Sequence, residues 1–422
     1  MVSFEPVRGM KDYYGIEAKK LRYLEELFRK HVEIAGYQET ITPIVEDFAL
    51  FAIKSGEEIR NTMYVFKDKA EREVALRPEI TPSIVRLYLN SMQHLPKPIR
   101  LYYIGRVYRY DEPQLGRYRE FRQAGVEMLG SNSILSDIEI IKLLYDFYNE
   151  LGLSKSILLK INNIGLYRSI FRKFNIEENV QEHLLHLIDK GKKDESMQIL
   201  NKYISQNNVL NLINTLLYSN LKMDEVESEI QKIGIKCLDE EFNRFKKTIT
   251  ILNNLNIRSV VDLSFVRGLA YYTGIIFEIT HPKVTFSVAG GGRYDNLVEI
   301  YGGTYTPAIG FAIGIERTSV LINYETYRSP QVVVIVLDDS VIDYALSILD
   351  ILRSSDIIAI LNVKEQSLGK LLSSYFEQNV RYAVIVGNNE KISRKVVLKD
   401  LASRSQEIVS SDELITHLRQ IL

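Results

Sequence analysis

The spacing of hydrophobic residues predicts both helices and strands in the first third of the chain. Apolar side chains recur every three or four residues over Leu21–Ala35, and Gly36 then provides a stop, which predicts a helix over about residues 17–35. Two segments rich in Tyr, Val and Ile, Ile99–Tyr110 and Arg119–Leu129, are joined by a turn-forming stretch. They predict a long antiparallel hairpin.

Another helix and several strands are indicated around that hairpin. Ser136 and Glu139 have the spacing of a capping box, which would open a helix that stops at Gly152. The strand-like segments are Tyr37–Thr42, Val74–Arg77, Ser259–Phe265, Gly274–Thr280, Thr285–Ala289 and Ala308–Ile313, the last running into a helix near Ile315.

Two changes of pattern divide the chain. From about residue 165 to 246 the sequence is rich in Lys, Glu, Asn and Leu with helical periodicity, and strand-like sequence lies on both sides. We therefore expect a helical insertion that interrupts one sheet. After the irregular Asn323–Pro330, short aliphatic runs alternate with helical stretches, which predicts a separate α/β domain. These runs are Val332–Leu337, Ile357–Leu361 and Ala383–Val386.

Length and composition agree with this division. At roughly 150 residues per domain, 422 residues make two to three domains. The 53 basic and 54 acidic side chains nearly cancel, so any nucleic-acid contact must be a local patch. The single cysteine, Cys237, excludes an intrachain disulfide and a Cys-rich zinc site, and we expect it to be buried. The chain starts without an apolar signal segment, and no aliphatic run is long enough to span a bilayer, so we expect a soluble cytoplasmic protein.

The familiar nucleotide and hydrolase motifs are missing. The sequence has no GxxxxGK[ST] loop, HExxH or GxSxG, and it offers no residue set to assign as metal ligands. Ala289–Arg293 is glycine-rich but lacks the lysine of a phosphate-binding loop. A tight turn and a ligand-binding segment are both open interpretations of it.

Three arginines stand in apolar or strand-end settings. A guanidinium is seldom placed there without an anionic partner. Each of Arg109, Arg267 and Arg317 could by itself be a structural ion pair. Three together suggest a clamp for a polyphosphate, because planar guanidinium groups suit phosphoryl oxygens.

The second strand of the hairpin has an unusual face. Strand alternation puts Gln123, Gly125 and Glu127 on one side, with a glycine between two polar side chains, so a ligand could lie on that glycine. A solvent-facing polar strip is the alternative. Earlier in the chain, Thr81 before a proline is a suitable helix N-cap, which explains Thr81 but leaves Glu79 unexplained.

Taken together, six segments resemble the histidyl-tRNA synthetase family of class II aminoacyl-tRNA synthetases, and the likeness covers nearly the whole chain. Two of these segments, known as motifs 2 and 3, are typical of class II enzymes. The segments Arg267–Thr273 and Ala289–Asp295 are typical of the enzymes for histidine. The segments are Val7–Asp12, Gly36–Pro43 with Glu46 (motif 1), Tyr108–Gln123 (motif 2), Gly310–Arg317 (motif 3), Arg267–Thr273 and Ala289–Asp295.

The resemblance implies a fold and a reaction. The expected fold is α+β, an antiparallel sheet flanked by helices, with residues 1–325 as the catalytic domain, the insertion within it, and residues 331–422 as an anticodon-binding α/β domain. The implied reaction joins L-histidine to the 3′ end of tRNA-His through a histidyl-adenylate made from ATP. Mg²⁺ would bridge the outer phosphates. Motif 1 implies a homodimer.

It also implies roles for individual residues. Arg109, Arg267 and Arg317 would be catalytic and would bind ATP, together with Asp111, Arg117 and Phe121. Glu127 and Tyr272 would bind the imidazole ring, Glu79, Thr81 and Gln123 the α-amino group, and Tyr294 would close the histidine pocket.

Two other functions remain to be weighed. A non-catalytic, histidine-sensing paralogue, such as an ATP phosphoribosyltransferase regulatory subunit, keeps this fold but usually lacks the C-terminal domain and the catalytic arginines. A class II synthetase for another amino acid leaves Glu127 and Arg267–Thr273 unexplained.

Three residues depart from the usual family pattern: Ala270, Asp111 and Arg122.

Overall fold

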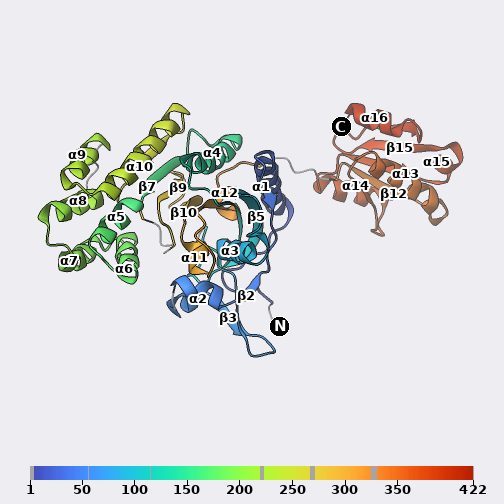
Figure 1. Ribbon diagram of the computed structural model, residues 1–422. Helices are drawn as coiled ribbons and strands as arrows, with labels where there is room; N and C mark the ends of the chain where they lie inside the picture. Colours follow the sequence, from blue (N-terminus) through green and yellow to red (C-terminus); the bar gives the residue numbers. More distant parts are fainter. Residues whose placement is uncertain are drawn as a thin grey trace. The chain divides into compact units, whose positions relative to one another are not determined.

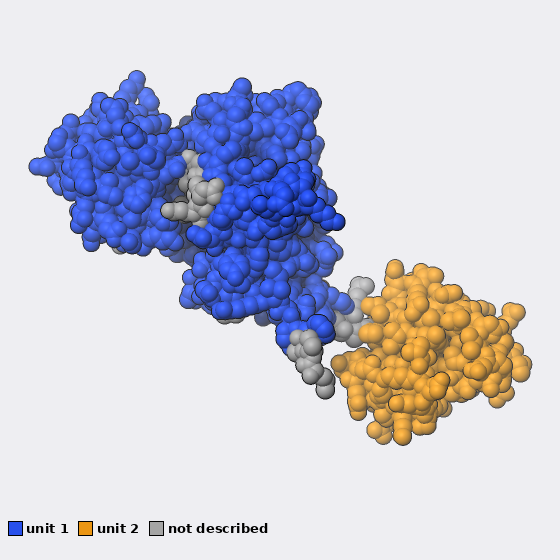
Figure 2. All heavy atoms as spheres, turned by 90° about the horizontal axis from the view of Figure 1, so that it is seen from below, with its two compact units in different colours: residues 1–323 blue, residues 324–422 orange. Residues whose placement is uncertain are grey.

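The computed structural model describes residues 4–55, 57–114, 116–218, 223–266, 271–324 and 330–421. Its contacts divide the chain into two compact units, Met1–Asn323 and Tyr324–Leu422, which are coloured separately in Figure 2. Within the described ranges, no helix is long and apolar enough to cross a membrane.

The first unit is built on an eight-stranded sheet with the order β1-β5-β6-β11-β10-β9-β7-β8. From β5 to β7 every neighbouring pair is antiparallel, and only the edge strands β1 and β8 pair in parallel. The expected α+β fold with an antiparallel sheet is confirmed. The strands are β1 Gln38–Glu39, β5 Ile99–Tyr108, β6 Glu120–Leu129, β7 Leu158–Asn163, β8 Ser259–Val261, β9 Ile275–Thr280, β10 Ala289–Arg293 and β11 Ala308–Gly314.

Helices α1 (Gly15–Ile34) and α4 (Ile134–Glu150) pack against the sheet through an aromatic core. The ring of Phe28 meets Phe147 edge-on at 5.4 Å between centroids and Phe311 at 6.3 Å. All three side chains are buried, so the apolar stripe that predicted α1 is the surface that faces the sheet. Helix α12 (Ile315–Ser319) continues directly from β11, as expected.

The first unit also contains a second, smaller sheet. Its three strands have the order β2-β4-β3, and short helices lie around it (Figure 1). The elements are β2 Val45–Asp47, α2 Ala49–Ser55, η1 Glu57–Thr62, β3 Tyr64–Lys67, β4 Glu73–Leu76, α3 Thr81–Leu87 and η2 Tyr88–Met92.

The described residues between β7 and β8 are helical and gather beyond the β7 side of the sheet (Figure 1). This is the segment in which charged and asparagine residues replace the strand pattern. Its helices are α5 Gly165–Lys173, α6 Glu178–Asp189, α7 Lys193–Tyr203, α8 Asn207–Tyr218, α9 Met223–Ile233 and α10 Lys236–Asn254.

The second unit is a five-stranded sheet with the order β13-β12-β14-β15-β16. Its three aliphatic runs form the parallel strands β12, β13 and β14. The antiparallel strands β15 and β16 have only two or three aliphatic residues each, flanked by polar ones, so no long aliphatic run marked them. The elements are β12 Val332–Val336, η3 Asp339–Val341, α13 Ile342–Ser354, β13 Ala359–Leu361, α14 Leu368–Glu377, β14 Tyr382–Val386, α15 Asn388–Ser393, β15 Lys395–Asp400, β16 Gln406–Ser410 and α16 Leu414–Ile421.

Two local expectations are wrong. The N-cap of α4 is Ser133, whose hydroxyl accepts a hydrogen bond from Leu135 N, whereas Ser136 is inside the helix and Glu139 pairs with Arg100. The capping-box spacing was therefore coincidental. Cys237 is exposed near the start of α10, so it is not a core residue.

The glycine-rich segment Ala289–Arg293 is strand β10 rather than a tight turn, and it replaces the strand expected over Thr285–Ala289. Neighbouring chains approach it too closely for side chains. A Cβ on Gly291 would lie 2.2 Å from the carbonyl oxygen of Gly310 in β11. Glycine is therefore required by packing in the centre of this sheet.

We expect Gly291→Ala to destabilise the first unit by about 1–3 kcal/mol, because the added methyl group meets backbone rather than a movable side chain. Gly274→Ala is the matched control, since a Cβ there would make an ordinary contact of 3.4 Å with Arg293. Differential scanning calorimetry compares the two variants. Equal melting temperatures would contradict the steric explanation.

Candidate active site

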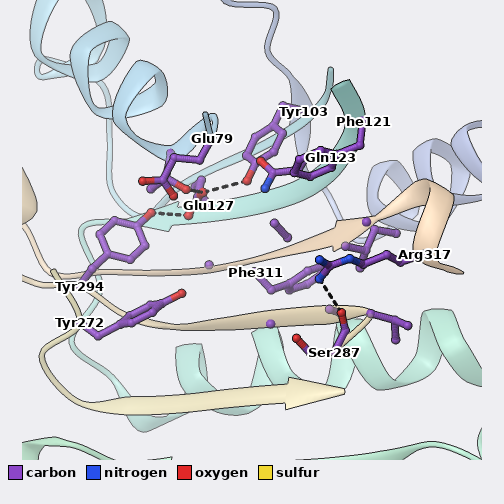
Figure 3. A pocket seen from close by; sticks show the side chains of 18 of the residues that line it. Glu79, Tyr103, Phe121, Gln123, Glu127, Tyr272, Ser287, Tyr294, Phe311 and Arg317 are labelled. Carbon is purple, nitrogen blue, oxygen red and sulfur yellow. Dashed lines mark hydrogen bonds between the residues drawn. The ribbon is translucent and has the colours of Figure 1, made fainter. Parts of the chain in front are cut away.

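A pocket of about 740 Å³ opens to solvent over strands β6, β10 and β11 (Figure 3). This pocket brings together residues that are far apart in the sequence. Many of them are candidate site residues that the sequence indicated. Those lining it are Glu79, Thr81, Arg109, Phe121, Gln123, Glu127, Tyr272, Tyr294 and Arg317. Arg267 and Ala270 lie outside the described residues.

Glu127 of β6 is a buried carboxylate of the pocket, with 2% of its surface exposed. Three hydroxyl groups donate hydrogen bonds to it. Oε1 accepts from Thr81 Oγ1 at 2.6 Å and from Tyr103 Oη at 3.3 Å, and Oε2 accepts from Tyr294 Oη. The opposite residue on β11 is Gly310, where a Cβ would lie 1.8 Å from Oε2, so only glycine leaves room for this carboxylate.

Burial raises the pKa of Glu127 to about 7, although the three hydroxyl donors oppose this effect by stabilising the charged form. The group therefore titrates near neutral pH. A carboxylate has about four lone-pair positions, and the hydroxyl groups occupy three of them. One position remains for a donor that enters the pocket.

The glycine on the same strand face is covered by the chain itself. Tyr103 pairs with Gly125 across the hairpin, and a Cβ on Gly125 would lie 2.5 Å from Tyr103 Oη. The space over Gly125 is therefore filled by the side chain of Tyr103. Because Gly125 has no side chain, the Tyr103 hydroxyl can reach Glu127. The alternative of a solvent-facing strip is wrong, because this part of β6 is buried.

Thr81 does not act as the expected helix N-cap. The N-cap of α3 is Ile80, and the hydroxyl group of Thr81 points instead to Glu127. The sequence rule identified the right helix start but assigned the hydroxyl to the backbone, because the tertiary partner is 46 residues away.

A second carboxylate, Glu79, lies at the same end of the pocket. Tyr271 Oη donates a hydrogen bond of 2.8 Å to Glu79 Oε2. Nearby, the side-chain oxygen of Gln123 is buried without a hydrogen-bond partner among the described residues. An acceptor of this kind is costly unless a ligand supplies the donor. Tyr271 was missed in the sequence, where its only signal was the Tyr–Tyr pair with Tyr272.

The opposite end of the pocket is basic. Arg109 Nε donates to the carbonyl oxygen of Pro78 at 2.9 Å, and its guanidinium lies 5.5 Å from the centroid of the Phe121 ring. No described carboxylate forms an ion pair with Arg109. Its position is thus fixed by neutral groups, which leaves its charge available to an anionic ligand.

Arg317 joins the loop between β5 and β6 to the sheet. Its Nε donates to Gly116 O at 2.7 Å, and Nη1 donates to Ser287 O at 2.9 Å. The guanidinium also stacks 5.1 Å from the centroid of Phe286. Ser287 lines the main pocket and Gly116 the adjoining one, so these two backbone contacts hold Arg317 at the basic end.

A smaller pocket of about 310 Å³ adjoins this basic end, with Asp111 and Arg117 in its wall. Arg117 Nε lies 3.6 Å from Asp111 Oδ2, and about half of the Arg117 side chain is exposed. The unusual Arg122 is placed elsewhere, in ion pairs with Glu316 at 2.7 Å and Glu25 at 3.0 Å. Arg122, which departs from the usual family pattern, is therefore part of a structural ion-pair network.

The chain is similar to known proteins over its whole length. The family model described as histidyl-tRNA synthetase matches residues 9–318, and a model of the anticodon binding domain matches residues 331–421. The chain is 55% identical over 428 residues to the histidine–tRNA ligase of Sulfurisphaera tokodaii, with all of both chains covered. Its fold is similar to histidyl-tRNA synthetase from Nostoc sp. PCC 7120, with a TM-score of 0.77 and 24% identity over the whole of both chains.

The fold alone does not separate a ligase from a regulatory protein. A structure described as an ATP phosphoribosyltransferase regulatory subunit/histidyl-tRNA synthetase from Bacillus halodurans C has a TM-score of 0.76 and 20% identity, over 90% of this chain and 98% of that one. The separation comes from sequence, because the similarity at 55% identity is to a ligase over its full length. The regulatory interpretation is not favoured.

Proposed function

The chain belongs to the histidyl-tRNA synthetase family, and we propose that it activates L-histidine with ATP and transfers it to the 3′ end of tRNA-His in the cytoplasm. One observation carries the proposal. A single pocket has a buried hydrogen-bond acceptor, Glu127, at one end and the guanidinium groups of Arg109 and Arg317 at the other. Such a pocket suits a small ligand with an N–H donor that must meet a polyphosphate.

Histidine fits the acceptor end. A neutral imidazole has one N–H donor and one bare nitrogen. Glu127 offers the acceptor position for the N–H group, and the Tyr272 hydroxyl, on a side chain only 5% exposed, is proposed to donate to the bare nitrogen. Tyr294 closes this end through its bond to Glu127.

The α-ammonium group of histidine would lie between Glu79 and the buried oxygen of Gln123, which needs a donor. Thr81 can still accept a hydrogen bond from it, because its own proton is directed to Glu127. Glu79 lies just before α3, Thr81 is its first residue, and Gln123 lies on strand β6. Their convergence would orient the carboxylate of histidine toward the basic end.

In the first step, the carboxylate of histidine attacks the α-phosphorus of ATP, and pyrophosphate leaves. No general base is required, because this carboxylate is already ionised at neutral pH. Catalysis is then positioning and stabilisation of charge. We assign the α-phosphate to Arg109 and, from the resemblance, to Arg267, and the outer phosphates to Arg317 and Arg117.

Phe121 and Asp111 complete the proposed ATP site, with Phe121 supporting Arg109. Within the described part of the chain, no group of three His, Cys, Asp or Glu side chains could hold a metal ion. We therefore treat Mg²⁺ as part of the substrate MgATP, bound by the outer phosphates. In the second step, the terminal ribose of tRNA-His attacks the activated carbonyl carbon and AMP leaves.

Histidine-dependent exchange of pyrophosphate into ATP, measured beside charging of tRNA-His, tests the proposal. We expect both activities from the purified chain. Binding of histidine without exchange would instead support the sensor function, and exchange driven by another amino acid would contradict the specificity.

We further propose a homodimer formed through the motif 1 region. Several apolar side chains are exposed there, among them Ile34 at 78% and Ile41 at 87%. Sedimentation equilibrium at low micromolar concentration should give twice the chain mass of 48.7 kDa. Ile41→Asp should shift the population to monomer, whereas Ile392→Asp, at an equally exposed isoleucine of the second unit, should not. A wild-type chain that is monomeric and active would refute the dimer.

We expect a chain of residues 1–325 to keep adenylation but lose most tRNA charging. The described residues assigned to histidine and ATP all belong to the first unit, and the anticodon-binding match belongs to the second. The candidate contacts for the RNA backbone in the second unit are Lys391, Arg394, Lys395, Lys399 and Arg404, of which Lys391 also forms an ion pair with the exposed Asp343.

Circular dichroism should first establish that the truncated chain is folded. Exchange and charging are then measured for both chains over a range of salt concentrations. Full-length protein should show the steeper salt dependence of tRNA binding. Equal charging by the two chains would show that residues 331–422 do not read the anticodon.

A further inference from the structure

The segment Tyr271–Gly274, which carries one wall of the histidine pocket, is held between two neighbours. On one side is strand β10, where Thr273 N donates to Arg293 O at 2.8 Å. On the other side is the start of the helical insertion. There, Ile164 N donates to Gly274 O at 3.1 Å, and Arg168 Nε donates to Tyr272 O at 3.0 Å.

Arg168 has an unusual place for a cation. It lies on α5, the first helix of the insertion, and only 9% of its surface is exposed. Burial lowers the pKa of Arg168, although a guanidinium remains protonated in proteins. A buried charge needs strong polar partners, and one of those of Arg168 is the backbone of the residue proposed to bind the imidazole ring.

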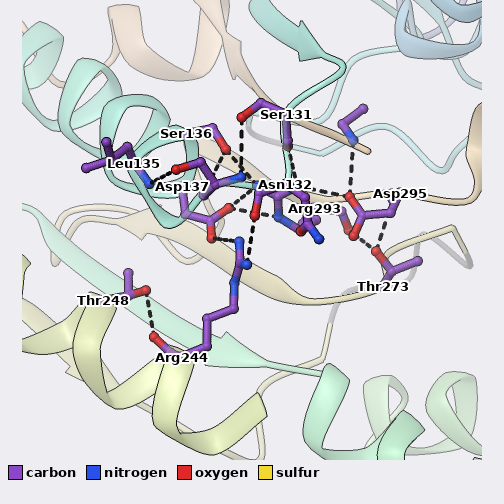
Figure 4. Close-up of polar contacts among 12 residues, drawn as sticks. Ser131, Asn132, Leu135, Ser136, Asp137, Arg244, Thr248, Thr273, Arg293 and Asp295 are labelled. Carbon is purple, nitrogen blue, oxygen red and sulfur yellow. Dashed lines mark hydrogen bonds and ion pairs between the residues drawn. The ribbon is translucent and has the colours of Figure 1, made fainter. Parts of the chain in front are cut away.

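The last helix of the insertion contacts helix α4 and, through it, the end of strand β10 (Figure 4). Arg244 of α10 forms an ion pair of 2.7 Å with Asp137, which is 2% exposed. Asp137 Oδ1 in turn accepts from Arg293 Nε at 2.8 Å. Arg293 immediately precedes Tyr294, whose hydroxyl binds Glu127. The first helix of the insertion therefore contacts the segment that carries Tyr272 directly, and the last is linked to Tyr294 through Asp137 and Arg293.

We propose that Arg168 is a positioning residue, through which the helical insertion sets the place of Tyr272 for histidine selection. The inference rests on the proposed function. The hydrogen bond is made to the carbonyl group of Tyr272 itself, so it restrains the direction of that side chain without touching the substrate. Small displacements of a group that must meet a ring nitrogen cost selectivity, because hydrogen bonds depend steeply on distance and angle.

We expect Arg168→Met to raise KM for histidine by roughly 10- to 100-fold, the effect of losing one hydrogen bond from a charged donor. KM for ATP should change by less than about twofold, because the ATP end is held by other elements. The preference for histidine over its two ring N-methylated isomers should fall as well. Arg168→Lys, which keeps a cation and a donor, should restore part of the effect.

Arg172→Met is the matched control. Arg172 lies one turn later on α5 and, like Arg168, lines a polar pocket beside the insertion; within the described part of the chain, its guanidinium donates to the helix backbone at Arg168 O. Its kinetic constants should stay within about twofold of wild type. A thermal melt of each variant identifies any loss of fold.

A double-mutant cycle separates positioning from general damage. If Arg168 acts through Tyr272, then Arg168→Lys should have little further effect on KM for histidine in a Tyr272→Phe background. Additive effects, or equal rises in KM for histidine and ATP, would overturn the inference. Absence of histidine-dependent exchange in the wild-type chain would instead refute the proposed function, so the two failures are distinguishable.

Discussion

Glu127→Ala is expected to lower kcat/KM for histidine by about 10³-fold or more. The substitution removes the acceptor for the imidazole N–H and leaves the hydroxyl groups of Thr81, Tyr103 and Tyr294 without their shared partner. Glu127→Gln, which keeps one oxygen acceptor, should lose less. Pyrophosphate exchange as a function of histidine concentration measures both. An unchanged apparent affinity for histidine would refute the pocket assignment.

The raised pKa of Glu127 gives this prediction a pH signature. Accepting the N–H group requires the ionised carboxylate, so kcat/KM for histidine should rise as pH increases through about 7. Glu127→Gln should show only the titration of free histidine, near pH 6.5.

Without bound histidine, the stability of the folded chain should fall as pH rises, whereas kcat/KM for histidine should increase. The pKa of Glu127 is higher in the folded chain than its usual value of about 4.3, so folding favours the protonated form. The stability contributed by that form is fully present below about pH 4 and is lost as pH rises through about 7. Histidine should therefore raise the melting temperature more at pH 8 than at pH 6 in the wild type, and this difference should shrink in Glu127→Gln.

The elements that the sequence predicted well are those whose local pattern agrees with their packing. The helix over residues 17–35 has one apolar stripe that meets the sheet, and the hairpin has two ten-residue strands separated by a turn-forming stretch. Both patterns depend only on neighbours in sequence. Strand β7 (Leu158–Asn163) was missed because it is short and ends in two asparagines, Asn162 and Asn163, whose side chains are satisfied by distant partners.

The detailed site could not be derived in this way. The carboxylate of Glu127 is surrounded by hydroxyl groups that are 46, 24 and 167 residues away, and no local rule relates these positions. The hairpin could have suggested Tyr103, because it lies directly opposite Gly125, but the register depends on a long connection whose length fixes no turn type. At Arg122, by contrast, the sequence showed an unusual residue, but the reason for it is a structural ion pair with Glu316 and not a ligand.

Arg109→Met is expected to lower the rate of pyrophosphate exchange by about 10²–10³-fold, with KM for histidine nearly unchanged. The charge that Arg109 is proposed to offset develops on the α-phosphate during the reaction, so its loss acts on the transition state more than on bound histidine. The side chain is already oriented by Pro78 O and Phe121, and little reorganisation is needed when ATP binds.

Strand β5, which ends one residue before Arg109, supplies the control for this experiment. Arg106 is exposed on β5 and pairs with Glu120 at 2.5 Å, so Arg106→Met removes a charge nearby without reaching the main pocket. Its exchange rate should stay close to wild type. Arg109→Lys should recover only part of the rate, because an ammonium group cannot donate two parallel hydrogen bonds to phosphoryl oxygens as a guanidinium does. Equal losses in Arg106→Met and Arg109→Met would mean that the field of the whole basic end, rather than contact by Arg109, promotes the reaction.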